Sequence, residues 1–152
     1  MTPTLGKRMD PARHAHVAIG ALAPGTVAEA LDAFCLAEKV PPDVTWRLQV
    51  ALDEIVANVV SHGAPAGGAG ALDVWFGRDG NIVEITVADD GPPFNPLERP
   101  APDLGRPLTA VQPGGLGILL VRALMDEVRY VRDGRNRLTL RKRIDGHSSD
   151  HP

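Results

Sequence analysis

The chain has 152 residues, of which 43% are hydrophobic and 23% charged, and its formal net charge is -3. This length suits one globular domain with one active site, and the weak acidity disfavours a surface that binds nucleic acid. No segment approaches the ~20 apolar residues of a membrane span, and residues 1–13 lack the apolar core of a signal peptide, so we expect a cytoplasmic protein. The single cysteine, Cys35, is expected to be a small buried side chain without a disulfide.

The N-terminal half predicts a strand followed by two helices. The strand is expected near residues 16–21, after a flexible tail over residues 1–13. Thr26 and Glu29 have the spacing of a capping box, and the helix behind them carries apolar residues at helical spacing, namely Val27, Leu31, Phe34 and Cys35. A pair of prolines separates this helix from a second one, whose apolar stripe ends near residue 63 and comprises Leu48, Ala51, Leu52, Ile55, Val56 and Val59.

The C-terminal half predicts a hairpin, a long loop, a third helix and a closing pair of strands. Residues 72–76 and 82–87 alternate like strands and flank a short turn. Seven prolines exclude regular structure from residues 92–113, and such long loops are often mobile lids. A helix then opens at residues 114–117, with one apolar face made of Leu116, Leu119, Leu120, Ala123, Leu124 and Val128. The final strand is expected at residues 137–144, before a flexible tail at 145–152.

The order of these elements predicts the fold class. Strands and helices do not alternate as they would in a parallel α/β fold. We therefore expect an α/β domain of the α+β kind over residues 14–144, a two-layer sandwich with helices on one face of a mixed, mostly antiparallel sheet.

The second helix carries Glu54 and Asn58, four residues apart and hence on one side. An amide oxygen of Asn58 suits Mg²⁺, and the carboxylate of Glu54 suits the acceptance of a proton from an attacking hydroxyl. A solvated glutamate and a surface asparagine are the alternative at this common spacing.

Asp89 ends the second strand of the hairpin, two residues before Gly91. One fixed carboxylate in an apolar pocket would accept a hydrogen bond from the exocyclic amine of adenine, and the glycine would let the ring approach the backbone. An ordinary acidic turn is the alternative.

A run of glycines, Gly114-Gly115-Leu116-Gly117, stands at the head of the third helix, where free N–H groups favour phosphate. An ordinary loop is the alternative. The run is neither a P-loop nor a G-x-G-x-x-G motif. The five histidines lack the spacing of a zinc site, and Ser61 does not lie in a nucleophile elbow.

Taken together, the three segments resemble the N, G1 and G2 boxes of Bergerat-fold ATPases, which are histidine-kinase-like ATPase domains. Residues 51–58 (ALDEIVAN), 89–96 (DDGPPFNP), 114–118 (GGLGI) and 124–128 (LMDEV) look like those of anti-sigma-factor serine/threonine kinases. The resemblance covers residues 17–144 and implies a Bergerat ATP-binding fold that uses ATP and Mg²⁺.

The resemblance also implies a role for each residue of the boxes. Glu54 would be the general base, Asn58 would coordinate Mg²⁺, Asp89 would bind adenine and Gly91 would border the base. Three residues of the G2 box, Gly115, Leu116 and Gly117, would hold the phosphates, and Thr139 would contact adenine through water. Such kinases are typically dimers that sequester a sigma factor and phosphorylate a small antagonist protein.

Two departures from the family pattern concern the predicted lid. Asn95 stands where the family often has aspartate, and Pro92-Pro93 replaces a glycine, which is expected to restrict motion of the lid. Arg99 and Arg106 in the same loop could reach the transferring phosphate, or could simply be solvated.

Two other functions remain open from the sequence. The same pocket would serve a non-catalytic ATP-gated protein-binding module. A histidine kinase fragment would need its acceptor histidine on another chain.

Overall fold

The computed structural model describes residues 11–62, 70–98 and 115–144. The elements along the chain are β1 (Arg13–Ala18), α1 (Ala23–Ala37), α2 (Pro42–His62), β2 (Ala71–Asp79), β3 (Ile82–Asp89), the short 3-10 helix η1 (Pro96–Glu98), α3 (Gly115–Leu124), β4 (Glu127–Arg132) and β5 (Asn136–Arg143). The order of the helices α1 to α3 and of the strands is the one that the sequence predicts, whereas η1 lies in the segment that was expected to be a loop without regular structure.

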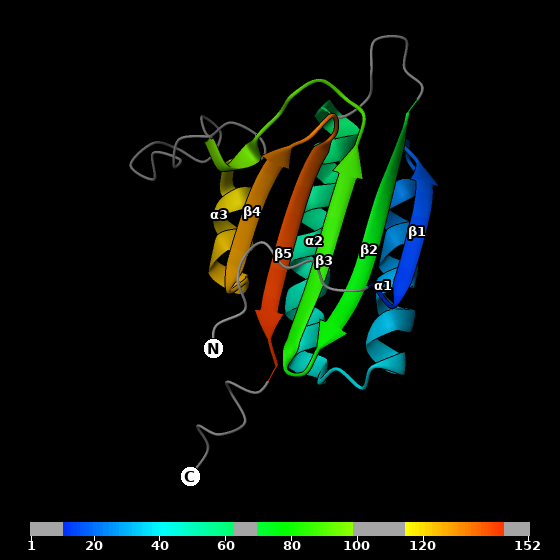
Figure 1. Cartoon of the computed structure of the whole chain (residues 1–152), viewed down its shortest axis with the longest axis vertical. Helices are drawn as coiled ribbons and strands as arrows, with labels where there is room; N and C mark the ends of the chain where they lie inside the picture. Colours follow the sequence, from blue (N-terminus) through cyan, green and yellow to red (C-terminus); the bar gives the residue numbers. More distant parts are fainter. Residues whose placement is uncertain (1–10, 63–69, 99–114, 145–152) are drawn as a thin grey trace.

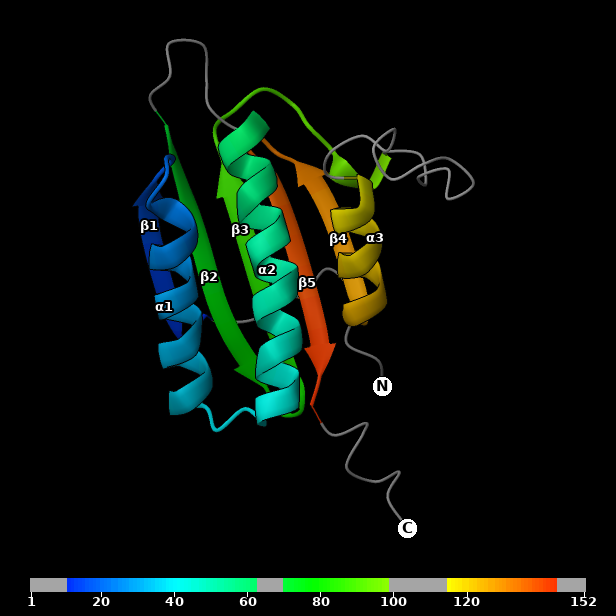
Figure 2. The same ribbon diagram turned by 180° about the vertical axis from the view of Figure 1, so that it is seen from behind.

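The strands form one sheet in the order β1-β2-β3-β5-β4. Every pairing among the described strands is antiparallel. The sheet forms one layer in Figure 1, and the opposite view in Figure 2 shows all three helices covering the same face. The predicted two-layer α+β sandwich is therefore confirmed, and the described part of its sheet contains no parallel pair.

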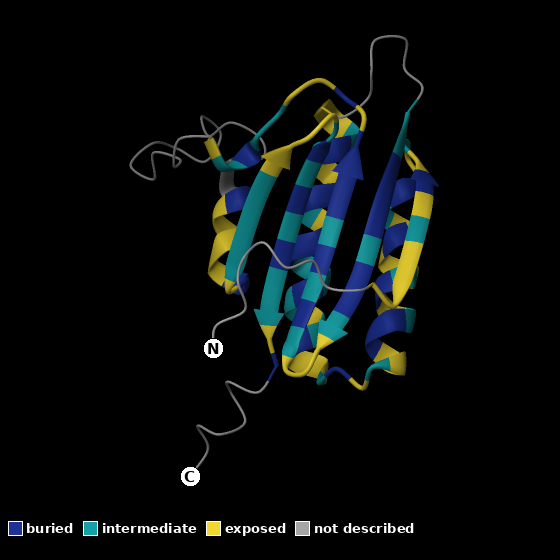
Figure 3. Ribbon diagram, viewed as in Figure 1, coloured by how far each residue is buried: buried dark blue, intermediate teal, exposed yellow. Residues whose placement is uncertain are grey.

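The core lies between the helices and the sheet. Alternate residues of the central strands point into this core and are fully buried, among them Val74, Phe76, Val83 and Ile85. Phe34 of α1 stacks on Phe76 with ring centroids 5.6 Å apart. Cys35 is buried beside Phe34, as predicted, and burial raises the pKa of its thiol. In Figure 3 the buried residues are most extensive along the central strands β2 and β3.

The beginnings of two elements differ from the prediction. Strand β1 starts at Arg13, earlier than predicted. His14 and His16 point to the outer face of this edge strand and Val17 points to the core, so polar residues make up much of the strand. Helix α1 starts at Ala23, and Pro24 occupies its first turn, where a missing N–H costs nothing. Thr26 therefore lies inside the helix, where its hydroxyl donates to Leu22 O at 3.0 Å, and the predicted capping box is wrong.

The predicted apolar face of α3 is correct only for Leu124. The helix ends at that residue, and among its described side chains Ile118, Val121 and Leu124 are buried. Leu119 and Leu120 are exposed, and Val128 belongs to β4. Leucine and isoleucine crowd so much of this short helix that hydrophobicity alone does not identify its buried side.

Some predicted features fall outside the described residues. They include residues 1–10 and 145–152 of the two tails and residues 99–113 of the predicted lid. Ala12 and Arg13 were assigned to the first tail, but Ala12 N donates to Phe76 O at 2.8 Å and Arg13 opens β1. Among the described helices, none has both the length and the hydropathy to cross a membrane.

Candidate nucleotide-binding site

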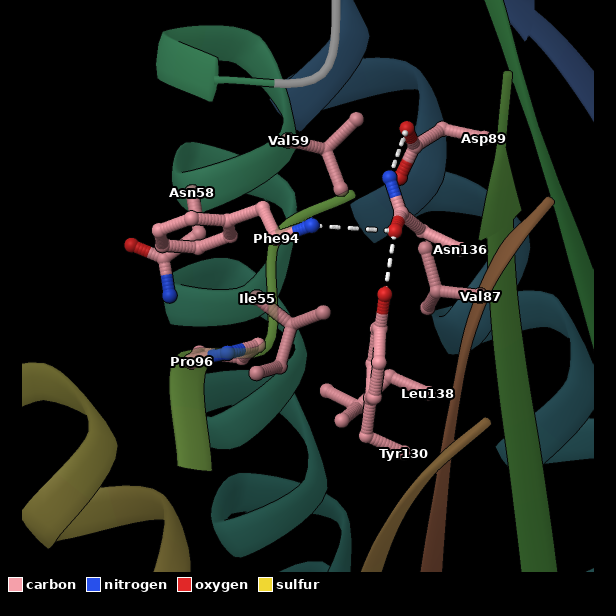
Figure 4. Close-up of a pocket in the computed structure, with 10 residues that line it drawn as sticks. All are labelled: Ile55, Asn58, Val59, Val87, Asp89, Phe94, Pro96, Tyr130, Asn136 and Leu138. Atoms are coloured by element: carbon pink, nitrogen blue, oxygen red, sulfur yellow. Dashed lines mark hydrogen bonds between the residues drawn. The ribbon is translucent and has the colours of Figure 1, made fainter. Parts of the chain in front are cut away.

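A cavity opens between the C-terminal half of α2 and the inner face of the sheet (Figure 4). Helix α2 contributes Ile55, Asn58 and Val59, and the strands contribute Val87, Asp89, Tyr130, Asn136 and Leu138. The lining is mostly apolar with a few polar groups at its edges, which is the usual character of a small-molecule site. Two of the predicted ATP-binding residues, Asn58 and Asp89, thus meet in one cavity.

The cavity is narrow in this conformation. Its volume is about 30 Å³, which is room for roughly two water molecules and less than a purine base needs. Phe94 and Pro96, from the segment after β3, occupy one side, and Tyr130 of β4 occupies another. A base can enter only after some of these groups shift.

The sheet places Asp89 and Asn136 side by side. They are register partners at the end of β3 and the start of β5, and both side chains are buried. Asn136 Nδ2 donates to Asp89 Oδ1 at 3.0 Å, and the backbone N–H of Gly91 donates to the same oxygen at 2.9 Å. These bonds fix the orientation of the Asp89 carboxylate at the edge of the cavity.

Asn136 is a site residue that the sequence analysis missed. Its Oδ1 accepts from Phe94 N at 3.1 Å and from the hydroxyl of Tyr130, and its Nδ2 also donates to Pro92 O at 2.8 Å. One amide therefore ties the carboxylate of Asp89 to the segment that leads out of β3. The position of Asn136 just after a turn gave only a weak signal, because its partners depend on the pairing of β3 with β5.

The segment after β3 is braced at several further points. Arg132 Nη1 donates to Gly91 O at 2.9 Å, and the rings of His62 and Phe94 stack with centroids 4.5 Å apart. Asn95 Oδ1 accepts from Leu97 N at 2.9 Å and so caps η1. Aspartate would accept the same bond, which explains how asparagine substitutes at this position.

Glu54 lies one turn before Asn58 on α2, and both side chains are half-buried. Glu54 does not line the cavity; its carboxylate lies against the start of α3. A β-carbon added to Gly117 would overlap Glu54 Oε2 and would lie 3.1 Å from Cδ. A larger residue at position 117 would therefore displace the carboxylate of Glu54 from its place against α3.

The other G2-box residues are described only in part. Gly115 and Leu116 open α3, and their backbone N–H groups belong to the first helical turn. The side chain of Leu116 lies outside the described residues, as do Gly114, Arg99 and Arg106.

The predicted contact between Thr139 and adenine is wrong. Along β5 the side chains of Asn136 and Leu138 face the cavity, so the side chain of Thr139 points to the opposite face of the sheet. There its hydroxyl lies 3.1 Å from the hydroxyl of Thr86.

A separate polar cluster lies on the outer face of the sheet around the buried Asp73. Oδ1 contacts His14 Nε2 at 2.8 Å and His16 Nδ1 at 2.7 Å, and Oδ2 accepts from Arg135 at 2.8 Å. Burial raises the pKa of Asp73, but the hydrogen bonds from His16, Arg135 and His14 outweigh it and lower the pKa to about 2.

No group of three or more His, Cys, Asp or Glu in the described parts of the chain could hold a metal ion. Mg²⁺ rarely uses an all-protein cage and usually binds through one or two side chains, water and substrate phosphates. The amide of Asn58 at the edge of the cavity fits that mode of binding.

Comparisons with known proteins agree with this architecture. A family profile described as histidine kinase-like ATPase domain matches residues 21–142. The serine/threonine-protein kinase BtrW of Bordetella bronchiseptica is 32% identical over 111 residues, which are 72% of this chain and 78% of the relative. The serine-protein kinase RsbW of Bacillus subtilis is 30% identical over 109 residues, 68% of each chain.

A solved structure shares the fold. It is the crystal structure of the RsbU and RsbW domains of a Mycobacterium tuberculosis protein, with a TM-score of 0.60 and 19% identity. The match covers 88% of this chain and 33% of that protein, so the present chain corresponds to one part of a longer one.

Proposed function

The chain belongs to the histidine kinase-like ATPase family, in the group of the anti-sigma-factor serine kinases, and on that premise we propose that it uses Mg-ATP to phosphorylate a serine or threonine of a small antagonist protein. The observation that carries the proposal is the placement of Asn58 in one cavity with Asp89, while Glu54, one turn away, lies against the start of α3.

Nucleotide binding follows from the cavity. The carboxylate of Asp89, which Asn136 and Gly91 orient, accepts a hydrogen bond from the exocyclic amine of adenine, and the base lies between the apolar walls of the cavity. The free N–H groups at Gly115, Leu116 and Gly117 bind the phosphates, because the N-terminus of a helix attracts anions. Asn58 would hold Mg²⁺, and the bound ion would supply positive charge that offsets the negative charge on the phosphates.

Phosphoryl transfer follows from the position of Glu54. The partner hydroxyl gives its proton to the Glu54 carboxylate, its oxygen bonds to the γ-phosphorus, and the bond from that phosphorus to the β–γ bridging oxygen breaks. The products are ADP and the phosphorylated partner. Much of the catalysis would come from positioning, so the place of the Glu54 carboxylate against Gly117 would contribute to the rate.

The same proposal extends to the partners and the location. The chain would act in the cytoplasm, where it would bind a sigma factor and release it according to the phosphorylation state of the antagonist. A homodimer is expected from the family resemblance and is tested by light scattering. Both relatives, BtrW and RsbW, are named as kinases, which favours a catalytic function for this chain over a non-catalytic ATP-gated binding module.

Replacing Glu54 by glutamine tests the proposal. The variant keeps the shape of the side chain but cannot accept the proton, so the rate of label transfer from γ-labelled ATP to purified candidate antagonists should fall about 10² to 10⁴ fold. The affinity for ATP should stay within a few-fold of wild type. Wild-type protein that binds ATP but labels no antagonist would instead support the binding module.

A further inference from the structure

A second and larger hollow lies on the other side of α2, between α1 and α2. The two helices lie side by side on the sheet (Figure 2), and the groove between them has a volume of about 290 Å³. Pro24 and Ala28 of α1 form one wall, and Trp46 and Val50 of α2 form the other. This groove is separate from the cavity that contains Asn58 and Asp89.

The proposed catalytic base borders this groove. Asp53 and Glu54 are both among its lining residues, and the Glu54 carboxylate also lies against Gly117 of α3. Glu54 therefore borders both the groove and the start of α3. A hydroxyl that lies in the groove beside Glu54 would also be near the start of α3, where the phosphates are proposed to bind.

The chemistry of the groove indicates what would occupy it. Trp46 leaves 57% of its surface exposed, an unusual exposure for a tryptophan, which is enriched at protein interfaces. The charged lining residues are the carboxylates of Asp53 and Glu54, and the described lining contains no Lys, Arg or His. Gln49 donates to the carboxylate of Asp32 across the two helices, which helps to hold the walls together.

We propose that the groove between α1 and α2 binds the acceptor segment of the partner protein, a basic stretch that carries the serine or threonine to be phosphorylated. This proposal rests on the proposed kinase function. The apolar wall at Trp46 would hold side chains of the segment, Asp53 would pair with a lysine or arginine next to the acceptor, and Glu54 would meet the hydroxyl.

The two tryptophans allow binding to be measured without activity. The chain has two, and Trp75 lies on the outer face of the sheet. In a Trp75→Phe background, emission reports Trp46 alone. The probes are two 15-residue peptides with one central serine, one flanked by lysine and arginine and the other by glutamate. Each is titrated with Mg²⁺ and a non-hydrolysable ATP analogue present.

Matched variants test the charge argument. Asp53→Lys inverts a charge in the groove, whereas Glu29→Lys makes the same change on an exposed residue of α1 that does not line it. The basic peptide should shift the emission of Trp46 and bind about tenfold more tightly than the acidic one. Asp53→Lys should weaken binding of the basic peptide about tenfold and raise the KM for that peptide while kcat stays unchanged. Glu29→Lys should change the peptide affinity and the KM by less than about twofold.

Equal affinity for the two peptides, or no response of Trp46 to either, would overturn the groove proposal even if ATP binds and an antagonist is phosphorylated. Failure of the protein to bind ATP would instead overturn the proposed function. The emission of Trp46 decides the groove proposal in either case, because it requires no transfer.

Discussion

Replacing Gly117 by alanine separates the position of the proposed base from the stability of the fold. The added β-carbon would overlap Glu54 Oε2, so the carboxylate must retreat by about 1 Å, a displacement that can cost about 10² fold in rate. The atom that moves is the end of a flexible side chain, so the strain is small. Alanine is also favoured over glycine in a helix by about 0.5–1 kcal/mol.

The account therefore predicts a protein that is as stable as wild type or slightly more stable, binds ATP with nearly wild-type affinity, and transfers phosphate about 10² fold more slowly. Gly25→Ala is the matched control, because Gly25 is also the third residue of its helix and an added β-carbon there meets nothing within 4 Å. Thermal unfolding, ATP titration and single-turnover label transfer are measured on both variants. Wild-type transfer by the Gly117 variant would refute the proposed placement of Glu54.

Three further predictions concern the fold and the cavity. Phe34→Ala should lower the free energy of unfolding by about 3–5 kcal/mol, whereas Leu36→Ala on the exposed side of α1 should change it by less than about 0.5 kcal/mol, as measured in urea. Asn136→Ala should weaken ATP binding by more than about tenfold in a calorimetric titration, because Asp89 loses the donor that orients it; unchanged affinity would show that Asn136 has no part in the site. Ionised Asp73 stabilises the fold at pH values above its ordinary pKa of 3.8, and this effect is lost as the pH falls toward its folded pKa of about 2. Over that range the free energy of unfolding should therefore fall more steeply with pH for wild type than for Asp73→Asn. Equal pH dependence of the two proteins in unfolding experiments would contradict the lowered pKa of Asp73.

Local patterns predicted the order of the elements and the layered fold. The alternation of β3 and the long apolar stripe of α2 are each specified by neighbouring residues, and they place Asn58 and Asp89 on facing surfaces. Errors occurred where local patterns were ambiguous. Apolar residues crowd α3 on several sides, and the polar residues at the start of β1 hide where this edge strand begins.

The missed parts of the site depend on contacts between distant segments. Asn136 reaches Asp89 only because β5 pairs with β3, and the contact of Gly117 with Glu54 requires that α3 pack beside α2. Thr139 was assigned to the pocket although its neighbour Leu138 faces the cavity, so strand alternation alone would have corrected that assignment.

The central claim is that the cavity beside α2 binds Mg-ATP, and ATP titration with and without Mg²⁺ tests it most directly. Wild type, Asn58→Ala and Asp89→Asn are compared in the same buffer. We expect Mg²⁺ to strengthen ATP binding to wild type, this gain to be lost in the Asn58 variant, and the Asp89 variant to bind ATP weakly under both conditions. Wild-type protein that binds no ATP, or variants that bind it as wild type does, would contradict the account.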